Sequence, residues 1–205
     1  MADSVPILFT ELSTIGGLSL ACIGAVTFIV KVAQDKREFR RKQAESARLL
    51  IRDVYDTAPS MAALNMLDYA SLTYDDLARN RQLFLTQEDV VFGLRSANVD
   101  ELSAGDIYVR DCFDALFLKL EQLASLLSVK YICWEDVSAV LGYYLFLIRR
   151  DSKLMPMVTN YAKIYGFPRV AAMIDDANKY PVDKFRGADE TMGERRPPDA
   201  AAPAS

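Results

Sequence analysis

The sequence contains no histidine among its 205 residues. Without imidazole, Ser-His and Cys-His nucleophilic pairs, histidine proton shuttles and histidine metal sites are excluded. Cysteine is scarce too, and three residues without paired spacing (Cys22, Cys112 and Cys133) argue against a disulfide framework and indicate a reducing compartment. A Gly-rich phosphate loop, a Cys-x-x-Cys pair and a Gly-x-Ser-x-Gly motif are also absent. We therefore expect a protein that is not an enzyme and that has no cofactor and no metal site.

The net charge of −4 is unevenly distributed along the chain. Residues 1–30 carry −2, residues 31–52 carry +5 and residues 53–205 carry −7. Phosphate backbones are bound through many Lys and Arg contacts, so an acidic main part argues against nucleic acid as a partner. The basic excess begins with a cluster of Lys31, Lys36, Arg37, Arg40, Arg41 and Lys42.

Residues 12–30 form an uncharged, mostly apolar run that ends at Lys31. A helix of this length spans about 28 Å, close to the roughly 30 Å of a bilayer's hydrocarbon core. A core helix of a globular domain would show a polar stripe, and a cleaved export signal would need basic charge before the run. The pattern therefore predicts an uncleaved transmembrane helix over residues 12–33.

The basic cluster predicts the orientation of this helix. Positive charge stays on the cytoplasmic side, so residues 1–11 would lie outside the inner membrane and the rest would face the cytoplasm. The cluster would contact anionic lipid headgroups of the bilayer. A strip of small residues could pack against a second copy or another membrane protein, although small residues are also simply common in membrane helices. The strip consists of Gly17, Ala21, Gly24 and Ala25.

The remaining chain predicts an all-α fold: one N-terminal transmembrane helix continuing into a stalk, then a cytoplasmic bundle of about five or six helices. Residues 34–57 read as a basic juxtamembrane helix, residues 58–180 as the helical domain, and residues 181–205 as a disordered tail rich in Pro, Ala and charge. No alternating strand pattern of convincing length is found, although "TYDDLARNRQLF" is ambiguous. Thr86 and the acidic residues after it predict a helix start, and Gly166 a helix end.

The clearest helix is "IYVRDCFDALFLKLEQLASLLSV", with Arg110 and Asp114 expected as a surface pair. The stretch "CWEDVSAVLGYYLFLIRR" predicts a second, centrally buried helix. The apolar face of the first helix comprises Phe113, Leu116, Phe117, Leu120, Leu123, Ala124 and Leu127.

Two clusters are candidates for a binding site. Asp111, Asp114 and Glu121 lie at spacings of three and seven along the chain. They could form an acidic line that binds a partner or a cation, or they could be the solvated face of an amphipathic helix. An aromatic cluster could line a ligand pocket, or could be core with polar handles. Its members are Tyr131, Trp134, Tyr143, Tyr144 and Phe146.

The stretch from Arg110 to Ile148, "RDCFDALFLKLEQLASLLSVKYICWEDVSAVLGYYLFLI", resembles a group of bacterial single-pass membrane proteins with a cytoplasmic helical domain of unknown function. In that group an R-x-x-F-(D)…LE helix is followed by an E-D…YY/YW helix. The resemblance implies fold and topology and no site residues.

Together these patterns favour a membrane-anchored, non-enzymatic helical interaction or scaffold domain. One alternative is an auxiliary subunit of a membrane complex in defence, transport or the envelope. Another is an enzyme that uses only carboxylate or tyrosine groups. The expected partners are the lipid bilayer and a second copy or another membrane protein.

Overall fold

The computed structural model describes residues 5–182 and residue 185, with the side chains of residues 5–26 and of Val99 left outside the description. The chain divides into two compact units, residues 1–45 and residues 46–205. The fold of each unit follows from its own residues.

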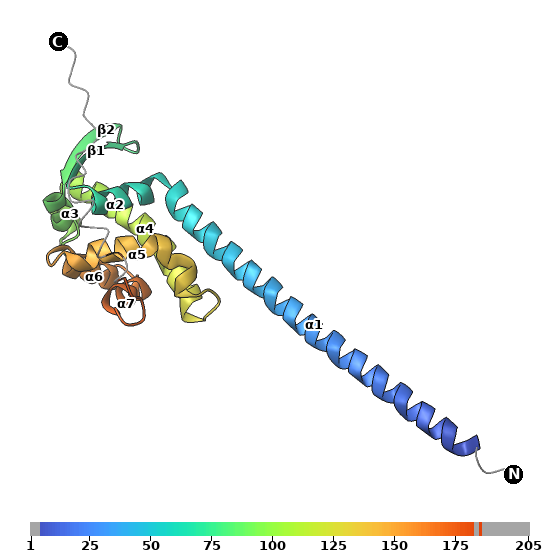
Figure 1. Cartoon of the computed structure of the whole chain (residues 1–205). Helices are drawn as coiled ribbons and strands as arrows, with labels where there is room; N and C mark the ends of the chain where they lie inside the picture. The colour runs from blue at the N-terminus through green and yellow to red at the C-terminus, as the bar shows by residue number, and fades with distance from the viewer. Residues whose placement is uncertain (1–4, 183–184, 186–205) are drawn as a thin grey trace. The chain divides into compact units, whose positions relative to one another are not determined.

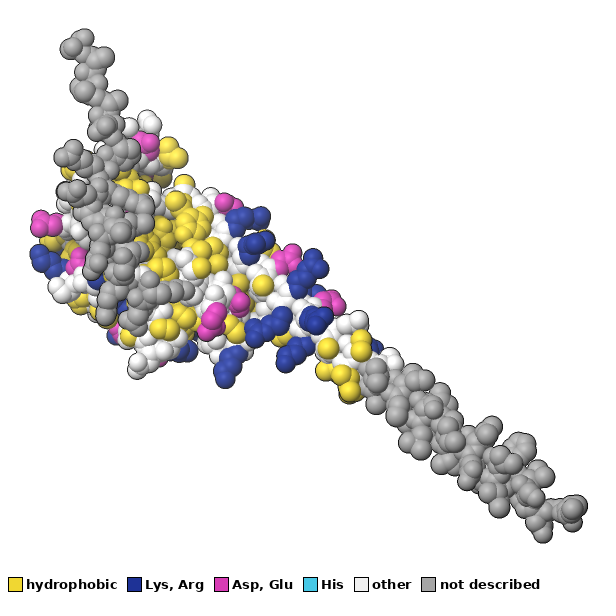
Figure 2. Space-filling model, viewed as in Figure 1, with side chains coloured by type: hydrophobic (Ala, Val, Ile, Leu, Met, Phe, Trp, Pro, Cys, Tyr) yellow, Lys and Arg dark blue, Asp and Glu magenta, His cyan; other side chains and the backbone are white. Residues whose placement is uncertain are grey.

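The first unit consists of most of helix α1, which runs from Val5 to Asp56 (Figure 1). From Lys31 to Asp56 the chain has no Gly or Pro and is rich in Lys, Arg, Glu, Gln, Ala and Leu, which favours a continuous helix there. All six residues of the predicted basic cluster are exposed, and Figure 2 shows Lys and Arg side chains gathered along this stretch. One of them, Lys42, pairs with Glu38 at 2.9 Å.

The prediction of a transmembrane helix over residues 12–33, and with it of a single-pass membrane protein, is corrected by the structure. Among the residues that the structure describes, no helix is long and apolar enough to cross a bilayer. The side chains described along α1 begin at Thr27, and Lys31, Asp35 and Lys36 soon interrupt the apolar residues there. The side chains of residues 12–26, on which most of the prediction rests, lie outside the description.

The second unit contains the end of α1 and a set of shorter elements (Figure 1). Its remaining described α-helices number six. In chain order the elements are α2 (Ala58–Asp68), β1 (Ser71–Asp76), β2 (Arg81–Thr86), α3 (Gln87–Gly93), the 3₁₀ turn η1 (Val99–Glu101), α4 (Ala104–Ser128), α5 (Trp134–Arg150), α6 (Leu154–Ile164) and α7 (Pro168–Asp175).

The prediction of an all-α fold is wrong because β1 and β2 form an antiparallel hairpin. Tyr74 and Asp76 of β1 point inward and are buried, whereas Asp75 between them is exposed, so the side chains alternate as a strand requires. The pattern is hidden in the sequence because the inner face includes a carboxylate and the outer face includes Phe84, which is 66% exposed.

The core lies around α4, whose predicted apolar face is buried throughout. Phe113 and Phe117 are fully buried and meet edge to face at 5.6 Å. Helix α4 packs against α2, α3 and α7. The predicted central helix, α5, is instead buried on one face only, because Tyr143, Tyr144 and Phe146 are partly exposed.

The helix start at Thr86 and the helix end at Gly166 agree with the sequence prediction, and the capping box at Ser103 adds to it. Thr86 and Asp89 form a reciprocal capping box at the start of α3, and Ser103 and Asp106 form another at the start of α4. Gly166 follows α6 with φ of 91°, where a residue with a side chain would be strained. These caps fix where the elements around the candidate site begin and end.

Candidate functional site

The residues predicted for membrane association do not form a described site. Gly17, Ala21, Gly24 and Ala25 lie among the residues whose side chains are outside the description. The basic cluster belongs to the first unit, where its members are exposed along α1. The side-chain clusters that could form a site belong to the second unit.

The predicted acidic line on α4 does not converge on a ligand, because each carboxylate binds a different element. Asp111 pairs with Arg79 of the hairpin turn at 3.1 Å. Asp114 accepts a hydrogen bond from the Tyr161 hydroxyl of α6 at 2.8 Å. Glu121 accepts from backbone amides of α7. Within the described part of the chain, no three His, Cys, Asp or Glu residues gather as metal ligands.

Asp114 and Tyr161 are an electrostatically coupled pair. Burial raises the pKa of the Asp114 carboxyl, and the hydrogen bond from Tyr161 only partly offsets it. Burial and the neighbouring carboxylate both raise the pKa of Tyr161. The pair therefore holds α6 against α4 through a bond between two partly buried side chains.

Arg110 is not half of a surface pair with Asp114, contrary to the sequence prediction. It is 8% exposed and donates to the carbonyl of Gly93 at 2.9 Å, the hydroxyl of Tyr165 at 3.0 Å and the carbonyl of Arg95. These bonds satisfy carbonyls at and beyond the end of α3. Arg110 therefore fixes α3 and the residues after it between α4 and α6.

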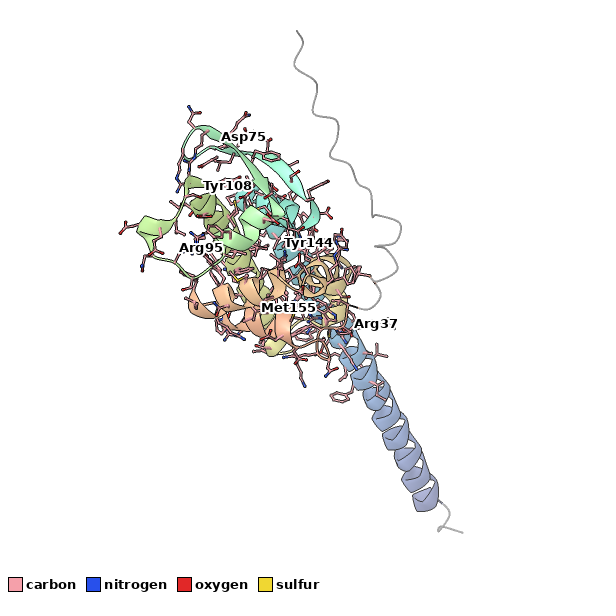
Figure 3. The ribbon with its side chains drawn as sticks, turned by 90° about the vertical axis from the view of Figure 1, so that its left-hand side faces the viewer. Arg37, Asp75, Arg95, Tyr108, Tyr144 and Met155 are labelled. Carbon is pink, nitrogen blue, oxygen red and sulfur yellow. The ribbon has the colours of Figure 1, made fainter. Side chains whose placement is uncertain are left out.

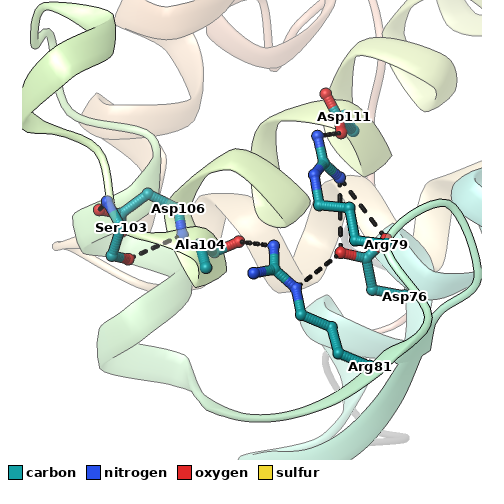
Figure 4. A network of polar contacts seen from close by, with 7 residues as sticks. All are labelled: Asp76, Arg79, Arg81, Ser103, Ala104, Asp106 and Asp111. Carbon is teal, nitrogen blue, oxygen red and sulfur yellow. Dashed lines mark hydrogen bonds and ion pairs between the residues drawn. The ribbon is translucent and has the colours of Figure 1, made fainter.

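Asp76 anchors the hairpin to the N-terminal part of α4 (Figure 4). Its side chain is 2% exposed and pairs with Arg81 at 3.0 Å and Arg79 at 3.4 Å. Arg81 also donates to the carbonyl of Ala104 at 3.2 Å, and Arg79 reaches Asp111. Sequence reasoning misses this network because its members come from two separate stretches of the chain, residues 76–81 and 104–111.

Cys112, the one described cysteine in the core, is buried. Burial raises the pKa of the Cys112 thiol to about 12. Tyr108, which Figure 3 labels, and Tyr74 lie beside it, and burial raises the pKa of both phenols. The cluster is structural.

A groove of about 540 Å³ lies between α3 and the beginning of α6. Its apolar lining is Val91 and Phe92 of α3 and Met157 of α6. Polar groups border it from both sides, namely Gln87, Glu88, Arg95, Asp151, Ser152 and Lys153. We call this feature the α3–α6 groove.

Three of these polar side chains make the groove rigid. Asp151 accepts from the amides of Lys153 and Leu154 at 2.8 and 3.0 Å, and Gln87 donates to the same carboxylate at 3.0 Å. The start of α6 is therefore already capped and offers no open anion site. The guanidinium of Arg95, labelled in Figure 3, lies 3.6 Å over the ring of Phe92.

Two opposite charges at the groove remain available. Arg95 is engaged with Asp106 at 3.3 Å and with the carbonyl of Phe92 at 2.8 Å. The side chains of Glu88 and Lys153, in contrast, have no ion-pair partner among the residues that the structure describes. Phe92 is 58% exposed. The groove thus combines an immobilised aromatic ring with one unpaired charge of each sign.

The predicted aromatic cluster on α5 is covered by the chain itself. The Trp134 indole donates to the carbonyl of Pro181 at 3.2 Å, and the Tyr143 hydroxyl donates to Asp68 of α2. Tyr144, labelled in Figure 3, packs edge to face on Tyr143 at 5.4 Å. Trp134 and Tyr143 of the cluster therefore bind other segments of this chain.

Comparison of the chain with models of protein families, with curated proteins and with solved structures finds no match. The resemblance to bacterial single-pass proteins stays a prediction. The geometry of the second unit is therefore the basis on which a function can be inferred.

Proposed function

We propose that residues 46–185 form a non-catalytic protein-interaction domain that binds a segment of a partner protein in the α3–α6 groove. The observation that carries the proposal is Phe92, whose exposed ring is held in place by the Arg95 guanidinium above it. An exposed aromatic ring fixed before binding loses little conformational freedom in a complex. A domain with this function could serve as an auxiliary subunit of a larger complex, bound to it through the groove.

The use of the acidic residues supports a non-catalytic role. Asp76, Asp111 and Glu121 hold elements together through ion pairs and backbone bonds. A catalytic site needs acid, base or nucleophilic groups that converge on one reacting atom. The carboxylates of this domain diverge to different elements.

The groove chemistry defines the partner segment. An apolar side chain would lie against Val91, Phe92 and Met157, and flanking charges would pair with Glu88 and Lys153. Such a segment buries a small area, so we expect a transient complex rather than an obligate one.

A photoreactive residue at Met157 of the full chain, irradiated in cells, tests the proposal. We expect a discrete adduct that Phe92→Ala abolishes, because the ring forms the apolar side of the groove. The double variant Glu88→Lys with Lys153→Glu keeps the net charge and exchanges the two signs, and it should also abolish the adduct.

The matched control is Phe84→Ala, which removes a similarly exposed ring from the hairpin. It should leave the adduct unchanged. An adduct that survives Phe92→Ala, or that Phe84→Ala removes to the same extent, would mean that the groove is not the binding site.

A further inference from the structure

The segment that follows α7 is held on α5 by its backbone. Trp134 donates to the carbonyl of Pro181, and its indole meets the ring of Tyr180 at 5.3 Å in an edge-to-face contact. Arg149 donates to the carbonyl of Tyr180 at 2.7 Å. Two consecutive carbonyls of the segment are therefore bound by side chains of one helix.

Arg149 also ends the preceding helix. Its guanidinium donates to the carbonyls of Met173 and Ile174 at 2.7 and 2.8 Å, in the last turn of α7. These carbonyls have no partner within the helix, so an arginine there is stabilising. The same side chain thus ends α7 and positions the start of the segment.

Gly142 provides a seat for an aromatic ring. A Cβ atom at Gly142 would lie 2.4 Å from Cε2 of Phe185, which is closer than any real contact. Tyr143 flanks the ring, with centroids 6.4 Å apart. Glycine inside a helix costs about 0.5–1 kcal/mol relative to alanine, and Gly142 has no positive φ to require it. The structure explains the glycine at position 142 by the space that the ring of Phe185 occupies.

Trp134, Gly142 and Arg149 follow one another at spacings of eight and seven, which places them on one face of α5. This face, with Tyr143, is called the α5 seat. It binds two backbone carbonyls, which a segment of any sequence has. It also contacts two aromatic rings, and few sequences have two aromatic residues at this spacing. Backbone bonds for affinity and pockets for selected side chains are how peptide-binding domains recognise extended segments.

We propose that the α5 seat is a peptide-binding site for segments of the form Tyr-Pro-x-x-x-Phe. The chain's own Tyr180, Pro181 and Phe185 occupy it, and a segment of the same chemistry from another chain competes for it. This inference is independent of the α3–α6 groove. A short tether holds the chain's own segment at an effective concentration in the millimolar range, so a free peptide binds well only after that segment is weakened.

The test uses the full chain and a fluorescent peptide with the sequence of residues 178–187, NKYPVDKFRG. Anisotropy should show binding to Phe185→Ala at least tenfold tighter than to the wild type, because the ring seat is vacated. The emission of Trp134, the single tryptophan of the chain, should change on binding. A peptide with alanine in place of its phenylalanine should not bind.

The decisive variant is Gly142→Ala combined with Phe185→Ala. Alanine is a better helix former than glycine, so circular dichroism should show an intact fold, while the added methyl group fills the ring seat. Peptide binding should be lost. Phe92→Ala and Phe84→Ala should both behave as the wild type, which separates this site from the α3–α6 groove. Equal binding to wild type and Phe185→Ala, binding retained by the double variant, or no binding to Phe185→Ala overturns the proposal.

Discussion

The carboxylate of Glu121 on α4 accepts a hydrogen bond from the backbone amide of Val170 on α7, at 3.0 Å. It also accepts from the amide of Arg169 at 3.1 Å and pairs with the Arg169 guanidinium at 3.1 Å. Phe167, at the N-cap position of α7, supplies no side-chain cap. A residue from a distant helix therefore performs the capping that α7 lacks locally.

Replacing Glu121 with alanine should lower the free energy of unfolding by about 1–3 kcal/mol, since two backbone amides lose a charged acceptor. Glu121→Gln keeps a hydrogen-bond acceptor without the charge, so it should lower the free energy of unfolding by less than Glu121→Ala does. Urea unfolding followed by circular dichroism measures both. Glu45→Ala, at an exposed position of α1, is the control and should change stability by less than about 0.5 kcal/mol. A loss for Glu121→Ala no greater than for the control would contradict the capping role.

Asp114 should make stability depend on pH. Its pKa is raised in the folded state, so the folded protein holds the proton more tightly than the unfolded chain does. The free energy of unfolding should therefore fall as pH rises from the ordinary aspartate value of about 3.9 through the raised pKa. Asp114→Asn cannot ionise and keeps an acceptor for Tyr161.

Urea unfolding across a pH series tests this. Asp114→Asn should match the wild type at the acidic end and gain relative stability as pH rises. Tyr161→Phe removes the bond that favours the ionised form, so it should steepen the decline. A constant difference between Asp114→Asn and the wild type at every pH would show that the carboxyl does not titrate in this way.

Cys112 should resist alkylation in the native protein, because burial raises the pKa of its thiol to about 12 and the side chain is 1% exposed. Mass spectrometry after iodoacetamide treatment at pH 8 should find its peptide unmodified, and modified once the protein is unfolded in urea. Cys133 is partly exposed and is the internal comparison. Equal labelling of both peptides under native conditions would argue against the packing around Tyr108.

Asp76→Asn should loosen the hairpin and cost about 2–3 kcal/mol, because it leaves Arg79 and Arg81 without their buried counter-charge. Hydrogen exchange should rise in peptides that cover β1 and β2. Asp75→Asn, one residue earlier, is the matched control, since Asp75 is exposed and bonds only to Gln82 among the described residues. If both variants exchange alike, the network around Asp76 does not hold the hairpin.

Much of the fold can be predicted because its signals are local. The apolar face of α4 repeats at helical period, and the capping box at Thr86 occupies four consecutive residues. The hairpin cannot be predicted in the same way, because a buried carboxylate on its inner face and an exposed phenylalanine on its outer face hide the strand pattern, and its contacts to Ala104 and Asp111 are distant in sequence. The membrane prediction depends on one run, and the described part of α1 does not support it.

The candidate sites are harder to predict than the fold. The α3–α6 groove joins Phe92 to Met157, far apart in sequence, and neither residue belongs to a motif. The sequence indicates the aromatic cluster but not its contacts with Tyr180, Pro181 and Phe185, because composition alone favours disorder from residue 181 onward. Gly142 is the available signal, since a glycine between large residues in a helix indicates a neighbour that needs the space.

Within one stretch of α4, four charged side chains each reach a different element: Asp111 the hairpin, Asp114 helix α6, Glu121 helix α7, and Lys119 the end of α1 through Asp53 at 2.7 Å. Two of these neighbours, α6 and α7, also pack against each other, and Lys163 of α6 pairs with Asp175 of α7 at 2.9 Å. The departure of α6 or α7 is costly because it leaves the partly buried carboxylate of Asp114 or Glu121 without its bonding partner. The second unit should therefore lose its structure in a single cooperative transition, with α4 the last helix to exchange its amide hydrogens.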